Sequence, residues 1–351
     1  MTNTVMDRKS LQGRIQTVTG LIEPARLGMT LMHEHLLCDL RTPTMMKSNE
    51  PEPDITLDNT YAINYGRVKH VGRYLMDLKD VAIAEMNAMK DLGGNAVVEL
   101  TCGGFKPDPG GLEEIALATG VNIVMGCGYY VEEYQDAGTM RREPDDFAEE
   151  MARHIFAGAW GTHVRSGIIG EIGCQYPWTA HEKRVMRGAV MAQGATGATL
   201  NIHPGRNEDL PLEIATTVKG WGADLSRTVI SHIDRTIFDE ARLLRLAATG
   251  AVIEFDLFGV ETSYYGLNER IIMPNDGRRL ELIRALIDRG HLNQVVISHD
   301  ICYRTRLTSF GGHGYGHIFA NVIPLMRQQK FADAEIDAIL IDNPRRLLTF
   351  V

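Results

Sequence analysis

The sequence predicts a (β/α)8 barrel, and three observations support this prediction. Apolar runs that suit buried strands alternate with helix-length segments along most of the chain. Eight such pairs occur over about 320 of the 351 residues, and a (β/α)8 barrel needs ~250 residues plus insertions. Several of the strand-like runs also end in His, Glu or Asp. We therefore expect residues 1–351 to form one domain. A doubly wound open sheet is the alternative, but no Gly-x-Gly-x-x-Gly turn follows an early strand.

Composition narrows the class of protein. Hydrophobic residues make up 44% and charged residues 23% of the chain, which is typical of a soluble globular protein. The formal net charge is −9 and the chain has no basic stripe, so we expect no nucleic-acid partner. The five cysteines are scattered without a Cys-x-x-Cys pair, which favours a reducing compartment. We see no signal peptide and no membrane-spanning run, so we expect a cytoplasmic protein with no membrane partner.

The N-terminal part departs from the repeat in two places. Residues 13–28 alternate enough to form a short strand or hairpin extension ahead of the barrel. The first barrel strand then ends in His33-Glu34-His35. Residues 41–60 are rich in Pro, Asp, Asn and Ser, which predicts a long loop. Loops of this length are uncommon unless they cover a site, so this one is a mild indication of function.

From residue 77 onward, helix and strand patterns alternate regularly. Helical periodicity predicts helices at residues 77–92, 111–119, 144–160, 181–193, 210–221, 237–248 and 278–289, and near 317–328 and 333–348. Strands are predicted at residues 95–100, 121–125, 167–171, 198–203, 228–232, 251–255 and 294–300. Gly93 and Gly94 mark the end of the first of these helices, and the acidic residues after Pro144 suit a positive helix N-terminus.

Metal-capable side chains stand where five of the strands give way to loops. His33 and His35 are two residues apart, and strand side chains at i and i+2 point to the same face. Four later strands end in the same way, at Glu171, His203, His232 and Asp300. The C-terminal ends of barrel strands meet on one face, where the active sites of this fold lie. We therefore expect these side chains to converge.

Such a set is too large for one tetrahedral zinc ion, which takes four ligands. We assign His33, His35 and Asp300 to one divalent ion, and His203 and His232 to a second ion. Glu171 lies between the two ions. A hydroxide that bridges the pair would be a nucleophile at neutral pH, because divalent ions lower the pKa of bound water toward ~7. Asp300 is the best placed general base. Zinc is the expected metal, although Mn, Co and Fe accept the same ligands.

The order of these ligands resembles that of the amidohydrolase superfamily: His-x-His, a carboxylate on the fourth strand, two histidines and an aspartate. The local segments resemble the phosphotriesterase-related proteins in particular, from about residue 13 to the C-terminus: Gly-Met-Thr-Leu-Met-His-Glu-His at 28–35, Gly-Glu-Ile-Gly at 170–173, Asn-Ile-His-Pro-Gly at 201–205, Ser-His-Ile-Asp-Arg at 231–235 and Ser-His-Asp at 298–300. This resemblance implies a metal-dependent hydrolase with a binuclear centre on a (β/α)8 barrel, usually a homodimer.

Three positions depart from that family pattern. Glu171 stands where phosphotriesterases and related lactonases use a carboxylated lysine, so it should supply the bridging carboxylate directly, as in the branch of the bacterial phosphotriesterase homology protein. Arg235 and Leu257 stand where phosphotriesterases carry the Asp and His of a proton relay. The lactonases place an Arg where Leu257 stands. These departures indicate weak or absent phosphotriesterase activity and weaken a homoserine-lactone assignment.

Loops after the strands offer candidates for the substrate pocket. Aromatic residues and arginines follow the third, seventh and eighth strands, and Tyr264 and Arg306 are among them. The predicted substrate contacts are six of these residues: Tyr129, Tyr130, Phe258, Tyr265, Tyr303 and Arg304. They would provide aromatic walls and a cationic group for a substrate that has an apolar part and a carboxylate or phosphate.

The sequence thus predicts a binuclear metal hydrolase that attacks the carbonyl of a small-molecule ester or lactone. Phosphoester hydrolysis is the first alternative. The second alternative is a TatD-like metal-dependent nuclease, which also carries Gly-Glu-Ile-Gly on its fourth strand. The acidic net charge of this chain and the long segment after the first strand count against that alternative. A barrel that binds a ligand without catalysis is the third, and the intact set of metal ligands argues against it.

Overall fold

The computed structural model describes residues 6–47 and 52–351, and its centre is a barrel of parallel strands. In chain order the described barrel strands are β3 (Thr30–Glu34), β6 (Ala96–Glu99), β7 (Asn122–Cys127), β8 (Ile168–Gly173), β9 (Leu200–His203), β10 (Thr228–Ile230), β11 (Val252–Phe255) and β12 (Val295–Ile297). Each strand pairs with the next in this order. Just beyond β12 the chain returns to β3, where the Asp300 amide donates to the His33 carbonyl at 3.1 Å. This is the (β/α)8 barrel that the sequence predicts.

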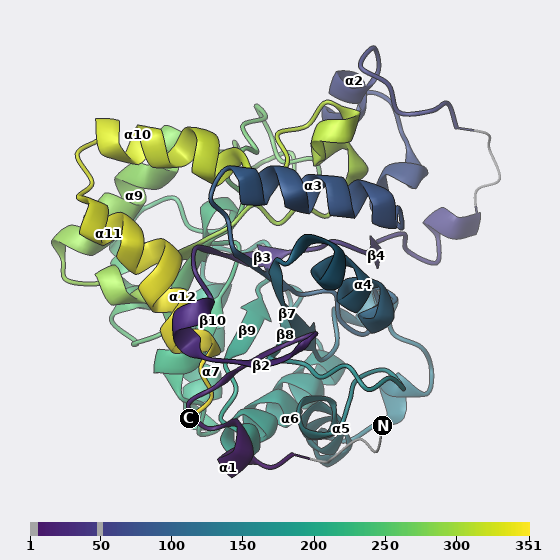
Figure 1. Ribbon diagram of the computed structural model, residues 1–351, viewed down its shortest axis with the longest axis vertical. Helices are drawn as coiled ribbons and strands as arrows, with labels where there is room; N and C mark the ends of the chain where they lie inside the picture. The colour runs from purple at the N-terminus through teal and green to yellow at the C-terminus, as the bar shows by residue number, and fades with distance from the viewer. Residues whose placement is uncertain (1–5, 48–51) are drawn as a thin grey trace.

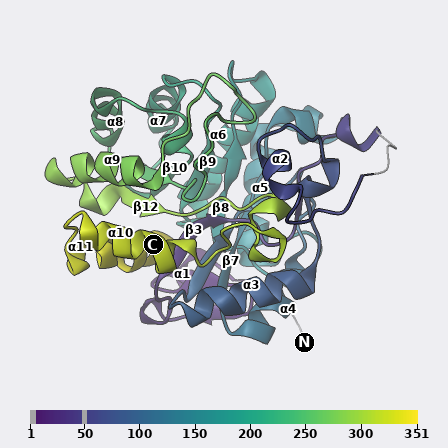
Figure 2. The same ribbon diagram turned by 90° about the horizontal axis from the view of Figure 1, so that it is seen from above.

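Helices surround the strands, as the view from above shows (Figure 2). The longer helices between barrel strands are α3 (Lys79–Asp91), α4 (Pro109–Thr119), α5 (Pro144–Phe156), α6 (Ala180–Thr196), α7 (Leu210–Gly220), α8 (Glu240–Ala247) and α9 (Asp276–Asp288). The short α1 (Arg8–Leu11) precedes the barrel, and α10 (Ile323–Gln328), α11 (Asp333–Asp337) and α12 (Asn343–Leu348) follow it, with π-helical turns at Ile318–Val322 and Ala338–Asp342. Caps set the helix starts: Asp239 caps α8, which begins at Glu240 and not at the predicted residue 237.

Strand alternation divides the apolar core into two layers. One set of side chains fills the barrel interior: Met32, Val98, Val124, Ile168, Val229, Val252 and Val296. Their neighbours along the strands, such as Leu31, Val97 and Ile253, pack outward in the larger cluster beneath the helices. Because both faces are buried, each strand is apolar throughout its length. This explains why the strands are visible in the sequence as short continuous apolar runs.

A hairpin closes the N-terminal end of the barrel. Strands β1 (Ile15–Thr17) and β2 (Gly20–Ile22) pair antiparallel, and Ile15 and Ile22 join the interior cluster. The Val18 amide donates to the Ile123 carbonyl at 2.9 Å, which ties the turn of the hairpin to β7. The predicted extension at residues 13–28 therefore covers the N-terminal end of the barrel. The opposite end of the barrel carries the loops that follow the strands (Figure 1).

The predicted loop after the first strand belongs to a longer excursion between β3 and β6. It contains β4 (Cys38–Asp39), α2 (Thr60–Asn64) and β5 (Leu75–Met76), and β4 pairs antiparallel with β5. Helix α2 stands at the end of the molecule opposite the hairpin (Figure 1). Residues 48–51 of the predicted loop lie outside the described residues. In the part of the chain that the structure describes, no helix is both long and apolar enough to cross a membrane.

Candidate metal centre

Both histidines of the first barrel strand turn into the barrel. The pairing register of β3 with β6 shifts between Leu31 and Glu34, the span that contains His33. This irregularity lets His33 face inward directly after the interior residue Met32, against strict alternation. His35 follows beyond the end of the strand, and its Nδ1 lies 3.0 Å from Thr101 Oγ1. Both imidazoles are almost completely buried.

Glu171 reaches the same point from β8. Gly170, just before it, has a φ of +138°, and a Cβ there would stand 2.7 Å from the Asn201 carbonyl oxygen. Only glycine combines this backbone conformation with so close an approach to β9. The Glu171 carboxylate then lies between the two histidines of the first strand: Oε1 is 3.5 Å from His35 Nε2, and Oε2 is 3.6 Å from His33 Nε2.

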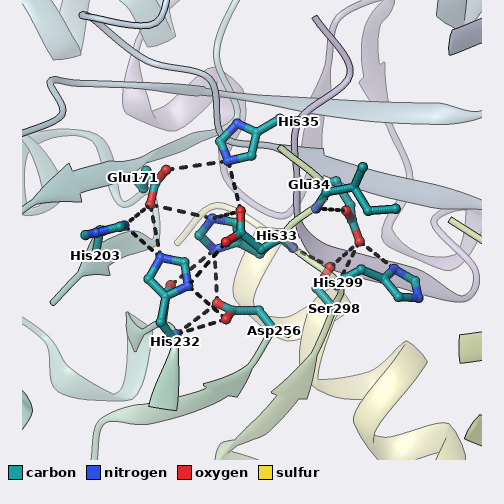
Figure 3. Close-up of polar contacts among 12 residues, drawn as sticks. His33, Glu34, His35, Glu171, His203, His232, Asp256, Ser298 and His299 are labelled. Atoms are coloured by element: carbon teal, nitrogen blue, oxygen red, sulfur yellow. Dashed lines mark hydrogen bonds and ion pairs between the residues drawn. The ribbon is translucent and has the colours of Figure 1, made fainter. Parts of the chain in front are cut away.

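Two further histidines approach the same carboxylate (Figure 3). His203, at the end of β9, places Nδ1 2.8 Å from Glu171 Oε2, and His232, after β10, places Nε2 3.4 Å from that oxygen. These two ring nitrogens are 2.7 Å apart. His232 has a φ of 55°, in the left-handed region that few non-glycine residues use, which is a frequent mark of a functional site. One carboxylate oxygen thus faces three imidazoles.

Asp300 joins the group from the loop after β12, and it too has a left-handed backbone, with a φ of 48°. Its Oδ1 lies 3.3 Å from His35 Nε2 and 3.9 Å from His33 Nε2. Its Oδ2 lies 3.8 Å from His232 Nδ1. Burial raises the pKa of the Asp300 carboxyl, but the hydrogen bond from His35 and the charge of His232 more than offset this effect, and the pKa lies below its usual range.

Other groups hold the ring nitrogens that face away from Glu171. Asp256 Oδ1 lies 2.8 Å from His232 Nδ1, and Glu254 Oε2 lies 3.3 Å from His33 Nδ1. The Tyr130 hydroxyl lies 3.2 Å from His203 Nε2. Partners of this kind fix the orientation and tautomer of a metal-ligating histidine. Asp256 directly follows β11, whereas Glu254 sits within β11, where the sequence offers no signal for its role.

The chemistry of these groups fits divalent metal ions. Imidazole and carboxylate ligands are those that zinc and similar ions accept. The Nε2 atom of His33 is buried and has no hydrogen-bond partner among the described residues. Ligand atoms of His33, Glu171 and His232 lie within 4.8 Å of one another, as do those of His33, His35 and Asp300. The structure therefore brings together all the side chains that the sequence assigns to the two ions.

Charge in the cluster leads to the same conclusion. Burial lowers the pKa of His203 to about 4, so its ring is neutral, which is the form that binds a metal. Burial opposes protonation of His33 as well, but the carboxylates of Glu171 and Glu254 raise its pKa well above the usual value. The buried carboxylates thus stabilise positive charge at this point, and a bound cation would supply it.

A cavity of about 640 Å³ opens beside the ligands and is lined by His35, Glu171, His203 and Asp300, among others. Three of the predicted substrate contacts lie on its wall: Tyr130, Tyr265 and Tyr303. Leu40, Phe105 and Tyr134 add apolar and aromatic surface. The cavity is therefore an amphipathic chamber with the candidate metal ligands at one side.

The structure corrects the other three predicted contacts. Adjacent residues at a strand end point in opposite directions, so Tyr130 faces the cavity while Tyr129 turns outward and donates its hydroxyl proton to Glu150. Phe258 is fully buried in the apolar core. Arg304 forms an ion pair with Asp77 and donates to a backbone carbonyl of β5. None of the three lines the cavity.

Two arginines of the cavity wall were not among the predicted substrate contacts. Arg235 is 1% exposed and donates to the Pro204 carbonyl at 3.1 Å. Arg206 extends its guanidinium over the Tyr265 ring, and its Nε is buried without a hydrogen-bond partner. Within the described residues neither guanidinium forms an ion pair with a carboxylate. Each follows a ligand histidine by three residues, and this His-x-x-Arg spacing was the available signal in the sequence.

A barrel with these side chains at the C-terminal ends of its strands has the architecture of a metal-dependent hydrolase. Comparison with known proteins specifies the family. Residues 13–348 match the model of the phosphotriesterase family, and the chain belongs to that family. The resemblance inferred from the sequence motifs is thereby confirmed, and the chain is a metal-dependent hydrolase.

Relatives and solved structures cover nearly the whole chain. It is 39% identical over 346 residues to the N-acetyltaurine hydrolase of Xenopus tropicalis, covering 97% of this chain and 99% of the relative. The N-acetyltaurine hydrolase of Homo sapiens is also 39% identical, with the same coverage. A resiniferatoxin-binding protein from Rhodobacter sphaeroides has a TM-score of 0.90 and 33% identity, covering 99% of this chain and 98% of that one. The Escherichia coli phosphotriesterase homology protein, with phosphate in its active site, has a TM-score of 0.76 and 28% identity, covering 92% and 99%.

Proposed function

We propose that this chain is a binuclear zinc hydrolase that cleaves the acyl bond of small anionic amides of the N-acetyltaurine type. The observation that carries this proposal is the pair of guanidinium groups, Arg206 and Arg235, on the wall of the cavity that also contains Asp300. A buried guanidinium without an acidic partner is costly, and an anionic substrate group would compensate for it. The N-acetyltaurine hydrolases among the relatives act on a molecule with an acetamide at one end and a sulfonate at the other.

Each end of such a substrate has a counterpart in the cavity. The planar guanidinium of Arg206 or Arg235 offers parallel donors to the oxygens of a sulfonate or carboxylate. Tyr130 and Phe105 pack against each other beside His203 and give the acyl group an apolar wall. Two divalent ions at the ligand cluster would polarise the acyl carbonyl and acidify the attacking water.

Asp300 has two tasks in this reaction. It accepts a proton from the water as the water oxygen bonds to the acyl carbon. It then donates that proton to the nitrogen as the carbon–nitrogen bond breaks, so that the leaving group departs as a neutral amine. The products are a carboxylic acid and an amino sulfonate or amino acid. The ester or lactone expected from the sequence would undergo the same attack on the carbonyl, with an alcohol oxygen as the leaving atom.

The test compares four substrates with metal-loaded protein: N-acetyltaurine, N-ethylacetamide as its uncharged analogue, O-acetylisethionate as its ester analogue, and a phosphotriester. We expect chelator-sensitive hydrolysis of N-acetyltaurine and its ester in preference to the other two. Arg206→Gln should lower kcat/KM on N-acetyltaurine by about 10- to 100-fold and leave N-ethylacetamide nearly unaffected, because one charge-assisted contact contributes ~1.5–3 kcal/mol.

Arg187→Gln is the matched control, because Arg187 is an exposed arginine on α6 that does not line the cavity. A preference for the phosphotriester would replace acyl hydrolysis by the phosphoester alternative. Equal losses on the charged and uncharged amides in Arg206→Gln would show that the arginine does not recognise an anion.

A further inference from the structure

A second, smaller cavity of about 270 Å³ adjoins the one over the metal ligands. Tyr265, Leu267 and Tyr303 line both cavities and so form the wall between them. The smaller cavity lies between the loops after β11 and β12 and the excursion that contains α2. None of the candidate metal ligands lines it. We call this space the side cavity.

Two guanidinium groups lie beside one aromatic ring in the wall of the side cavity. The central carbons of Arg73 and Arg306 each lie 5.0 Å from the centre of the Tyr303 ring. Arg73 donates to the Ile63 carbonyl, and Arg306 donates to the Asp300 carbonyl at 2.9 Å. Within the described residues neither has a carboxylate partner. Because these two guanidiniums form no ion pair with a described residue, they make the side cavity favourable for an anion.

One acid also lines the side cavity, and it has another task. Glu261 is exposed, and its Oε1 accepts the backbone amide of Asp276 at 2.8 Å, which fixes the start of α9. The side cavity therefore keeps a net positive charge. A single exposed carboxylate does not neutralise two guanidiniums.

Two buried polar atoms at the side cavity have no hydrogen-bond partner among the described residues: Thr305 Oγ1 and His313 Nε2. Thr305 is fully buried, so its hydroxyl lacks both protein and solvent partners. His313 Nδ1 lies 3.0 Å from the Gly314 carbonyl and donates to it, which leaves Nε2 as a bare acceptor in the neutral ring. Nε2 would stand 2.8 Å from a Cβ on Gly259, another lining residue, so this edge of the ring packs against the Gly259 backbone in the cavity wall.

We propose that the side cavity is a phosphate-binding site, distinct from the metal centre. The two arginines and the Thr305 hydroxyl supply donors for the charged oxygens. His313 Nε2 supplies an acceptor for the P–OH group, which phosphate retains near neutral pH and sulfate lacks. The ligand is inorganic phosphate or the phosphate group of a larger molecule, since both present the same oxygens. Tyr265 and Tyr303 would transmit occupancy of this site to the cavity that holds the substrate.

The test is calorimetric titration of the metal-loaded protein, and of the chelated protein, with inorganic phosphate, sulfate and glycerol phosphate. We expect phosphate binding that persists after chelation, because protein groups alone form the site, and weaker binding of sulfate.

Arg73→Gln should weaken phosphate binding by about tenfold or more. Thr305→Val should weaken it too, and this variant should fold normally because it removes a hydroxyl without a partner. Arg67→Gln, an exposed arginine on the same excursion, is the control and should bind as the unaltered protein does.

The outcomes separate clearly. Tighter binding of glycerol phosphate than of phosphate would assign the side cavity to a phosphate carried by a larger molecule, and the reverse would assign it to the free ion. Loss of all phosphate binding on chelation would place phosphate at the metals and overturn the proposal. Unchanged affinity in both Arg73→Gln and Thr305→Val would overturn it as well, and equal affinity for sulfate would remove His313 from the site.

Discussion

At the residue scale, exposure distinguishes Asp300 from the other candidate ligands. Its side chain is 14% exposed, whereas that of His203 is 8% exposed and those of His33, His35, Glu171 and His232 are 0–3% exposed. The carboxylate therefore lies at the border between the ligand cluster and the cavity. In the proposed reaction, a group at this border reaches both the attacking water and the substrate. Position and chemistry together make Asp300 the candidate general base.

Asp300→Asn is expected to reduce kcat by about 10²- to 10⁴-fold, because a carboxamide does not accept the proton of the attacking water. The amide oxygen keeps one ligand atom in place, so affinity for a non-hydrolysable anionic analogue should change only a few-fold. Steady-state kinetics and analogue titration measure the two quantities. Metal content is determined on the same samples, because a drop in bound metal would give a trivial loss of activity. Unaltered turnover in the fully loaded variant would remove Asp300 from the mechanism.

At the element scale, a buried charge network joins the segments that follow β10 and β11 to α9. Arg279, on α9, contacts Asp234 and Asp276 at 2.8 Å each, and it donates to the Val260 carbonyl. Asp234 also accepts the Leu257 amide at 2.9 Å. The Arg279 and Asp234 side chains are completely buried. The network thus fixes the loops that carry Arg235 and that form one wall of the side cavity.

Asp234→Ala is expected to lower the free energy of unfolding by about 3 kcal/mol, the lower end of the range for a broken buried ion pair, because Asp276 remains bound to Arg279. Denaturant unfolding of the metal-loaded protein measures the change. Glu281→Ala is the control: it breaks the exposed pair of Arg278 and Glu281, and such pairs contribute about 0–1 kcal/mol. Equal losses in the free energy of unfolding for the two substitutions would show that the buried network stabilises the protein no more than an exposed ion pair does.

At the scale of the whole molecule, the metal ligands come from strands spread around the barrel. His33, Glu171, His203 and His232 lie on or directly after β3, β8, β9 and β10, and Asp300 follows β12. A metal bound to these groups would link the first strand to the last and both to the middle. The unfolded chain has no such site, so metal binding is linked to folding.

Removal of metal is therefore expected to lower the thermal midpoint. Ligand present at a thousandfold excess over its Kd stabilises the folded state by about 4.1 kcal/mol. For a chain of this length that corresponds to a shift on the order of 5 °C. Calorimetry on chelated and reloaded protein measures the shift, and zinc, manganese and cobalt are compared in the reloading step. A midpoint unaffected by chelation and reloading would mean that the cluster holds no tightly bound ion.

The sequence alone was enough to predict the barrel and to identify its candidate metal ligands. Buried parallel strands are short continuous apolar runs, and each ligand stands where such a run ends, so local patterns carry the information. The hairpin at residues 13–28 was visible for the same reason. The longer excursion was predicted only as a loop, because the two-residue strands β4 and β5 form through contact with each other and not through their own propensity.

Tertiary structure decided which residues surround the ligands. Whether Tyr129 or Tyr130 faces the cavity depends on the direction of one strand end, and the inward turn of His33 depends on a register shift with β6. Glu254 contacts His33, and Arg73 contacts the Tyr303 ring. Both partners are distant in the chain, so no local pattern reveals these two residues. The candidate metal ligands stand at strand ends, so the sequence itself determines them. The residues that line the cavities come from loops distant in the chain, so only the packing of those loops determines them.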